Sequence, residues 1–278
     1  MRIAISNIAW DTVEDEATAR LLHRFGVDAI DVAPGKYFPE PAKATDEDIA
    51  RIKNWWSERG VEITGMQALL FGTNGLNVFG PPEVRDAMLQ HLGAVCRIGG
   101  SLGAKRLVFG SPKNRDRTGL SDQVAMDVAV SFFRDLGDIA QNHGVVICLE
   151  PNPSCYGANF MTTSAETALV VNQIAHPAIG MQLDTGALAI NGEDPATVLQ
   201  GYASLIGHIH ASEPDLLPLG DGGTDHGKMF AALEQHLPNH VVSIEMLATS
   251  NEPHEASIER ALAVAVRHYR NHGIEAKT

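Results

Sequence analysis

Short apolar runs and amphipathic segments alternate along nearly the whole chain. The apolar runs are rich in β-branched residues and are bounded by turn residues, which is typical of strands that are buried on both faces. We therefore predict eight strands. They are Ile3–Ser6, Ala29–Val32, Glu62–Met66, Arg106–Phe109, Val145–Glu150, Gly180–Asp184, Leu205–His210 and Val241–Met246.

Most of the segments between these runs carry apolar residues at helical spacing. Asp46–Arg59, for example, places Ile49 and Ile52 on one side and is followed by Gly60, which suits the end of a helix. The other predicted helices are Pro81–Leu102, Asp122–His143, Ser164–Ala175, Asp194–Ser204, Gly227–His236 and Glu255–His272.

Alternating strands and helices predict a parallel sheet, because a parallel connection needs a crossover that a helix supplies. Eight such units in 278 residues predict an α/β fold of the (β/α)8 TIM-barrel type, with a parallel eight-stranded barrel. No GxGxxG motif follows the first strand, which argues against a doubly wound dinucleotide-binding sheet. No low-complexity linker divides the chain, so we predict a single TIM-barrel domain over residues 1–278.

Composition excludes several classes of partner. The formal net charge is −13, with 34 acidic against 21 basic residues, and the basic residues cluster only in the short Lys113–Arg117 stretch. Nucleic-acid binders need a basic surface to displace counterions from phosphates, so we predict no nucleic-acid partner. The absence of a long uncharged apolar run argues against a membrane span.

The start of the chain and its cysteines bear on the compartment. Met1 leads directly into a strand-like run without a basic and then apolar leader, so we predict a cytoplasmic protein. Cys96, Cys148 and Cys155 form no CxxC pair, which argues against a disulfide framework or a zinc knuckle.

The last four predicted strands each end on or near a side chain that can bind a metal. These residues are Glu150, Asp184, His210 and Glu245, and the carboxyl ends of barrel strands converge on one rim. Three carboxylates brought together would repel one another and take up protons unless a cation compensated them. One imidazole with carboxylate oxygens suits one divalent ion, with Mn²⁺ first and Mg²⁺, Co²⁺ or Zn²⁺ as alternatives.

Five further residues are candidates for substrate binding. Trp10 follows the first strand, Arg115 follows the fourth, and His208 shares a strand face with His210. Asp225 lies in a Gly-rich loop after the seventh strand, and Glu213 lies shortly before this loop. We expect Trp10 to form part of a wall against which a sugar stacks. The alternative is a packing role for His208 and a solvated or flexible loop for Arg115, Glu213 and Asp225.

The motifs CLEPNP, QLDTG, GHIHASE and SIEM resemble those of the sugar phosphate isomerase/epimerase family, in the xylose isomerase-like TIM barrel superfamily. The resemblance covers nearly the whole chain and is closest to ketose 3-epimerases and hydroxypyruvate isomerases. It implies that Glu150, Asp184, His210 and Glu245 are metal ligands, and that Glu150 and Glu245 are also the paired acid and base on the two faces of a sugar. The metal would then chelate a carbonyl and a neighbouring hydroxyl, stabilising an enediolate.

Three positions depart from the ketose 3-epimerase pattern. Ala187 stands where a histidine is expected, Leu216 where an arginine is expected, and the region around Tyr156 lacks a second glutamate. These changes do not affect the four implied metal ligands, but they argue against epimerisation of free ketoses. The extra histidines of the more distant relative endonuclease IV are also missing, which argues against DNA repair.

We therefore predict a divalent-metal-dependent isomerase or epimerase of a small sugar, sugar phosphate or polyol derivative. A metal-dependent lyase of the same superfamily, such as an inosose or 3-dehydroshikimate dehydratase, is one alternative. A non-catalytic sugar-binding barrel is another. The predicted partner is a small sugar-like molecule, and an exposed face of the barrel could pair with a second copy of the chain.

Overall fold

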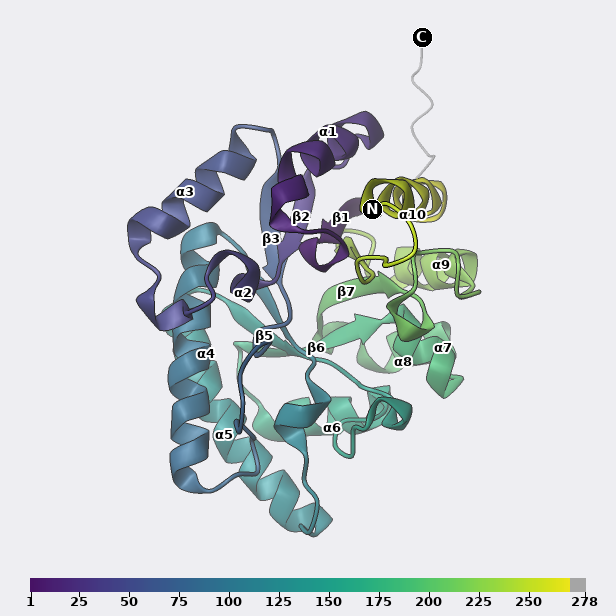
Figure 1. Cartoon of the computed structure of the whole chain (residues 1–278). Helices are drawn as coiled ribbons and strands as arrows, with labels where there is room; N and C mark the ends of the chain where they lie inside the picture. The colour runs from purple at the N-terminus through teal and green to yellow at the C-terminus, as the bar shows by residue number, and fades with distance from the viewer. Residues whose placement is uncertain (271–278) are drawn as a thin grey trace.

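The computed structural model describes residues 1–270. Its strands form a closed barrel in sequence order, with each strand parallel to its neighbours and the last paired to the first (Figure 1). The strands are β1 (Arg2–Ser6), β2 (Ala29–Val32), β3 (Glu62–Met66), β4 (Arg106–Phe109), β5 (Val146–Leu149), β6 (Ile179–Asp184), β7 (Ile206–Ser212) and β8 (Val241–Glu245). The predicted (β/α)8 barrel is confirmed.

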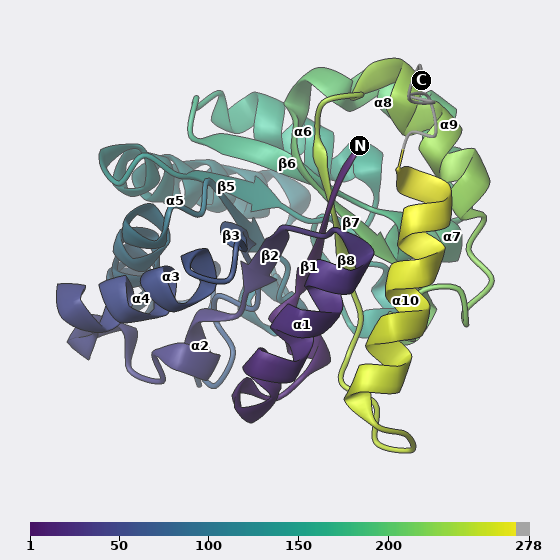
Figure 2. The ribbon, with the colours of Figure 1, turned by 90° about the horizontal axis from the view of Figure 1, so that it is seen from above.

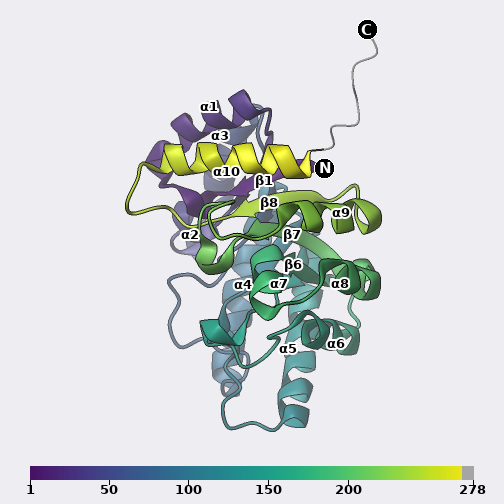
Figure 3. The same cartoon turned by 90° about the vertical axis from the view of Figure 1, so that its right-hand side faces the viewer.

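Helices surround the barrel (Figure 2), and the last of them lies beside the first and closes the ring (Figures 2 and 3). The helices are α1 (Asp15–Phe25), α2 (Pro34–Tyr37), α3 (Asp46–Ser57), α4 (Pro82–Leu102), α5 (Asp122–Asn142), α6 (Ser164–Ile174), α7 (Thr185–Asn191), α8 (Pro195–Tyr202), α9 (His226–His236) and α10 (His254–Tyr269). Residues 271–278, and with them the end of the predicted helix Glu255–His272, lie outside the described residues. One domain over residues 1–278 therefore stays a prediction.

Three helices are missing from the sequence prediction, namely α1, α2 and α7. Helix α1 does bury one side, with Thr18, Ala19, Leu21 and Leu22, so its amphipathic pattern was present in the sequence, whereas α2 has only four residues, too few to show a helical period. Helix α7 starts directly at the end of β6, and its first four residues are all buried, so it shows no contrast between an apolar and a polar side. Between residues 1 and 270, no helix combines the length and the apolar content needed to cross a bilayer.

The core has one layer inside the barrel and another between the barrel and its helices. In the outer layer Phe109 of β4 meets Phe133 of α5 edge to face, with ring centroids 5.3 Å apart, a favourable aromatic geometry. The strands are thereby held rigidly from outside. Polar side chains at their carboxyl ends are therefore positioned by a packed scaffold.

Candidate metal centre

Four side chains selected from the sequence come together at the carboxyl ends of neighbouring strands. Glu150 directly follows β5, Asp184 ends β6, His210 lies in β7 and Glu245 ends β8. One oxygen or nitrogen atom from each lies within 4.8 Å of those of the others, and all four residues are buried. Residues far apart in the sequence therefore form one compact group of metal-binding atoms, which we call the four-residue cluster.

The imidazole of His210 stands between the two glutamates. Its Nδ1 atom lies 3.4 Å from Oε1 of Glu150 and 3.1 Å from Oε2 of Glu245. Oε2 of Glu150 accepts a hydrogen bond from Nδ2 of Asn152 at 3.1 Å. The carboxylate also passes close to the main chain of Gly110, where a Cβ atom would come within 2.0 Å of Oε2. A glycine at this position therefore leaves the space that Glu150 occupies.

Asp184 is held from two sides. Its Oδ1 atom accepts from the main-chain N–H of Ala187 at 2.6 Å, which caps α7, and its Oδ2 atom accepts from the hydroxyl of Ser212 at 2.7 Å. A side chain at a helix N-terminus that also faces neighbouring carboxylates has little freedom to move away from them. Asp184 is thus fixed within the cluster by the fold itself.

The electrostatics of the cluster show the strain of crowded carboxylates. Burial raises the pKa of Asp184, and Glu245 and Glu150 raise it further, to about 8. Burial lowers the pKa of His210, but the two glutamates outweigh it and hold that pKa well above its ordinary value. The chain alone therefore retains protons within the cluster at neutral pH.

These residues fit a divalent cation. Oε1 of Glu150 is buried and has no hydrogen-bond partner, so it is available as a ligand atom. Three carboxylates and one imidazole are a donor set for hard or borderline divalent ions. A cation would replace the retained protons and compensate the like charges. The structure thus contains a candidate metal site.

Two of the predicted substrate-binding residues lie in the core. Trp10 is completely buried; its Nε1–H donates to Asp15 at 2.7 Å and its ring meets Trp56 edge-on. Arg115 is also completely buried, and its Nη1 donates to the main-chain carbonyl of Glu150 at 2.7 Å. In this conformation neither side chain offers a surface to a substrate. Arg115 instead holds the backbone of Glu150.

The other three candidates have different environments. His208 is buried behind His210, with the two rings nearly perpendicular and their centroids 5.0 Å apart. Glu213 is buried and binds the Gly-rich loop, accepting from the main-chain N–H groups of Gly220 at 2.7 Å and Thr224 at 2.9 Å. Asp225 is exposed and caps α9. Their roles in substrate binding stay predictions.

Glu213 leads to a prediction about stability. Burial acts to raise its pKa, but hydrogen bonds from His226, Thr224 and Gly220 lower it from 4.5 to about 2. A folded-state pKa below the unfolded one stabilises the fold above pH 4.5, and this contribution is lost as the pH falls towards 2. We expect Glu213→Gln to lower the free energy of unfolding at pH 7 by about 2–3 kcal/mol.

Urea unfolding at several pH values measures this effect. The wild-type chain should lose stability more steeply than the variant between pH 4.5 and 2. Asp225→Asn is the control, because asparagine also caps helices, and it should match the wild type within about 0.5 kcal/mol. Equal acid dependence in wild type and Glu213→Gln would contradict the prediction.

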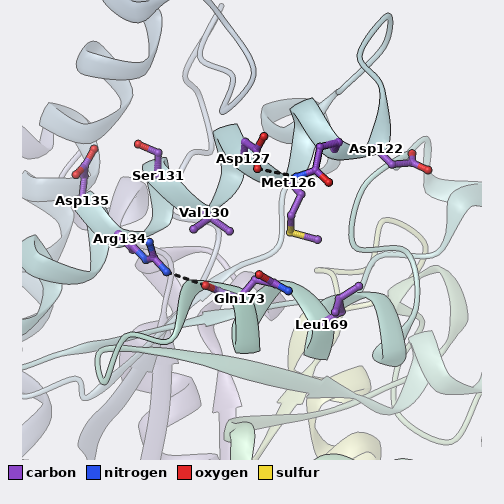
Figure 4. Close-up of a pocket in the computed structure, with 10 residues that line it drawn as sticks. Asp122, Met126, Asp127, Val130, Ser131, Arg134, Asp135, Leu169 and Gln173 are labelled. Carbon is purple, nitrogen blue, oxygen red and sulfur yellow. Dashed lines mark hydrogen bonds between the residues drawn. The ribbon is translucent and has the colours of Figure 1, made fainter.

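A separate groove of about 670 Å³ runs between α5 and α6 on the outside of the barrel (Figure 4). Met126, Val130 and Leu169 lie between the two helices, and Arg134 donates to the main-chain carbonyl of Gln173 at 2.9 Å. The residues that line it include no member of the four-residue cluster. The groove is therefore distinct from the candidate metal site.

Sequence reasoning missed several residues that shape the site. Asp31, within the otherwise apolar run Ala-Ile-Asp-Val of β2, and Gln182, two residues before Asp184, both point inward and are completely buried next to His208. A charged residue inside an apolar strand was a signal that the sequence offered. No comparable sequence signal marks Gly110 as the residue that leaves space for Glu150.

The fold and the cluster define the class: a (β/α)8 barrel with a candidate metal site at the carboxyl ends of its last four strands. The profile of one family, described as "Xylose isomerase-like TIM barrel", matches residues 19–268. The chain therefore belongs to the xylose isomerase-like TIM barrel family, as the resemblance of its motifs implied.

Individual relatives are distant. L-ribulose 3-epimerase of Methylomonas sp. (strain DH-1) is 29% identical over 107 residues, which span 38% of this chain and only 37% of that protein. Among solved structures, D-psicose 3-epimerase from Clostridium cellulolyticum H10, determined with D-tagatose, has a TM-score of 0.79 at 18% identity and covers 97% of this chain and 99% of its own. The IOLI protein, determined with a bound zinc atom, has a TM-score of 0.75 at 19% identity and covers 97% and 98%. These structures share the fold.

Proposed function

We propose that this protein is a divalent-metal-dependent isomerase or epimerase that acts on a small sugar, sugar phosphate or polyol derivative. One observation carries the proposal: two buried glutamates, Glu150 and Glu245, approach the same imidazole nitrogen of His210. They come from β5 and β8, with two strands between them in the barrel, so they reach a shared centre from different sides. A pair of acids placed in this way suits the removal and return of one proton.

Each residue of the cluster then has a role. Glu150, Asp184, His210 and Glu245 would hold the metal, for which we propose Mn²⁺. When bound, such an ion supplies Lewis acidity, which lowers the pKa of a C–H group beside a substrate carbonyl. One glutamate accepts that proton and the other, or the same one, returns it. The hydrogen bond from Asn152 and the hold of Arg115 on the Glu150 main chain keep this carboxylate in place.

The family and the fold relatives support the class of substrate. The structure of one fold relative was determined with D-tagatose, and the sequence relative is named as a sugar epimerase. Apolar or aromatic side chains at Ala187, Leu216 and Tyr156 favour a substrate other than a simple free ketose. We therefore include phosphorylated sugars and cyclic polyol ketones among the candidates.

Deuterium exchange tests the proposal. Metal-stripped protein is loaded with Mn²⁺ and incubated in D₂O with a panel of ketoses, aldoses, sugar phosphates and inososes. We expect deuterium at the carbon beside the carbonyl of one substrate, with formation of an isomer or epimer detected by proton NMR. Loss of water with new ultraviolet absorbance would instead identify a dehydratase. Binding without exchange would identify a sugar-binding barrel.

A further inference from the structure

A second group of buried polar residues lies behind the four-residue cluster. Asp31 of β2 and His208 of β7 lie side by side, with Nε2 of His208 2.8 Å from Oδ2 of Asp31. One oxygen or nitrogen atom from each lies within 4.8 Å of a ring nitrogen of His210. The Asp31–His208 pair therefore backs the one imidazole of the candidate metal site.

The position of Asp31 is built into the fold. The side chain is completely buried, and its Oδ1 atom accepts from the hydroxyl of Thr64 at 3.1 Å. Residue 65 is glycine, and a Cβ atom there would come within 2.5 Å of Oδ1. The β2–β3 register shifts between Ile30 and Asp31, and such a bulge re-aims the side chain that follows it. Space, partner and strand geometry all favour a carboxylate at this point.

Gln182 connects His208 to His210. It too directly follows a register shift, between Met181 and Gln182 in the β6–β7 pairing. The main-chain N–H of His210 can only donate and the main-chain carbonyl of His208 can only accept. The amide therefore turns its oxygen towards His210 N at 3.1 Å and its nitrogen towards His208 O at 3.0 Å.

This orientation determines the proton on His208. The amide nitrogen of Gln182 donates to Nδ1 of His208 at 3.1 Å, so Nδ1 carries a lone pair and the proton resides on Nε2. Nε2 lies 2.8 Å from Oδ2 of Asp31, and the negative charge of an ionised carboxylate at this distance favours a proton on Nε2. Asp31 and Gln182 thus select the same tautomer of His208 from opposite sides of its ring.

The same amide acts on His210. Its oxygen accepts from Nδ1 of His210 at 3.1 Å, so in the metal-free chain this nitrogen, which faces Glu150 and Glu245, carries a proton that a bound metal would displace. The other ring nitrogen, Nε2, is buried without a hydrogen-bond partner.

We propose that Asp31 is a positioning residue for the metal centre: through His208 and Gln182 it holds the ring of His210, so that Nδ1 faces Glu150 and Glu245 and is presented to the metal. The inference rests on the metal site of the proposed function and is independent of the reaction that the site catalyses. It predicts that Asp31 affects metal affinity without contacting the metal.

Calorimetric titration of metal-stripped full-length protein with Mn²⁺ tests the proposal. Asp31→Asn removes the carboxylate charge; with its amide oxygen kept on the Thr64 hydroxyl, its amide nitrogen faces Nε2 of His208 and moves the proton to Nδ1, against the Gln182 amide. We expect Mn²⁺ affinity to fall about 10- to 100-fold. Asp15→Asn is the matched control, because Asp15 is also buried but bonds to Trp10 and Tyr37; its Mn²⁺ affinity should equal that of the wild type.

Nitrogen-15 NMR of the imidazoles supplies a readout that a merely structural role would not move. In metal-free wild-type protein, His208 should carry its proton on Nε2, and in Asp31→Asn on Nδ1, with the signal assigned by its loss in His208→Gln. A proton on Nδ1 in the wild type would overturn the proposal, even if Asp31→Asn failed to fold. Equal Mn²⁺ affinity in wild type and Asp31→Asn would overturn the positioning role alone, whereas no Mn²⁺ uptake by the wild type would overturn the proposed function as well.

Discussion

Replacing Glu150 with glutamine is expected to slow proton exchange between substrate and solvent about 10²- to 10⁴-fold. Glutamine has nearly the same shape, so it fits the space beside Gly110 and can still accept from Asn152. Its neutral amide cannot take a proton from carbon, however. The rate of deuterium incorporation into the substrate in D₂O, at saturating Mn²⁺, measures the effect.

Two comparisons make this result specific. Glu245→Gln should lose exchange to a similar extent, because the same proton is returned by the partner acid. Glu255→Gln is the control, since Glu255 is exposed in the first turn of α10 and its loss should leave exchange unchanged. Calorimetry on each variant separates loss of metal from loss of the base. Full exchange in a metal-loaded Glu150→Gln protein would show that the base lies elsewhere.

Asp184→Asn is expected to have opposite effects on the metal-free and the metal-loaded protein. The folded-state pKa of Asp184 is raised from 3.8 to about 8. Its favourable contribution is therefore fully present below pH 3.8 and is lost as the pH rises through 8. Removing the carboxylate from the cluster should stabilise the metal-free protein at pH 8 by on the order of 2 kcal/mol.

The same substitution should weaken metal binding. Mn²⁺ at about 100 times its Kd would stabilise the wild type by about 2.7 kcal/mol, and Asp184→Asn should lose most of this gain. Thermal unfolding with a chelator and with Mn²⁺ measures both effects. Asp194→Asn is the matched control, because Asp194 also caps a helix, α8, but is exposed and lies outside the cluster. A metal-free Asp184→Asn protein that is less stable than the wild type would contradict the charge-crowding argument.

Strand and helix periodicity carried most of the fold prediction. The predicted strands agree with the barrel strands to within two residues at each end, because a buried parallel strand is a local apolar run. It was also predictable that the four side chains of the four-residue cluster lie close together. Each member stands where a buried run ends or nearly ends, and the barrel brings such ends to one rim.

Other features of the site depended on contacts between distant segments. Trp10 and Arg115 follow strands and were expected near the substrate, yet helices and loops that pack over them leave both completely buried. Glu213 was recognised as a loop residue, but only the folded loop shows that its carboxylate is enclosed by main-chain N–H groups. Position along a strand predicts a direction, whereas burial depends on what else packs there.

By itself, the sequence determined the number and order of the strands, the closed barrel and the residues at its carboxyl rim, because periodicity and strand ends are properties of neighbouring residues. Only the tertiary structure decided how Asp31 meets His208 and how Gln182 faces His210. Those contacts depend on strand register and on two local register shifts, one beside Asp31 and one beside Gln182. A shift of one residue turns a side chain to the other face of a strand, and no pattern of apolar and polar residues records where that shift occurs.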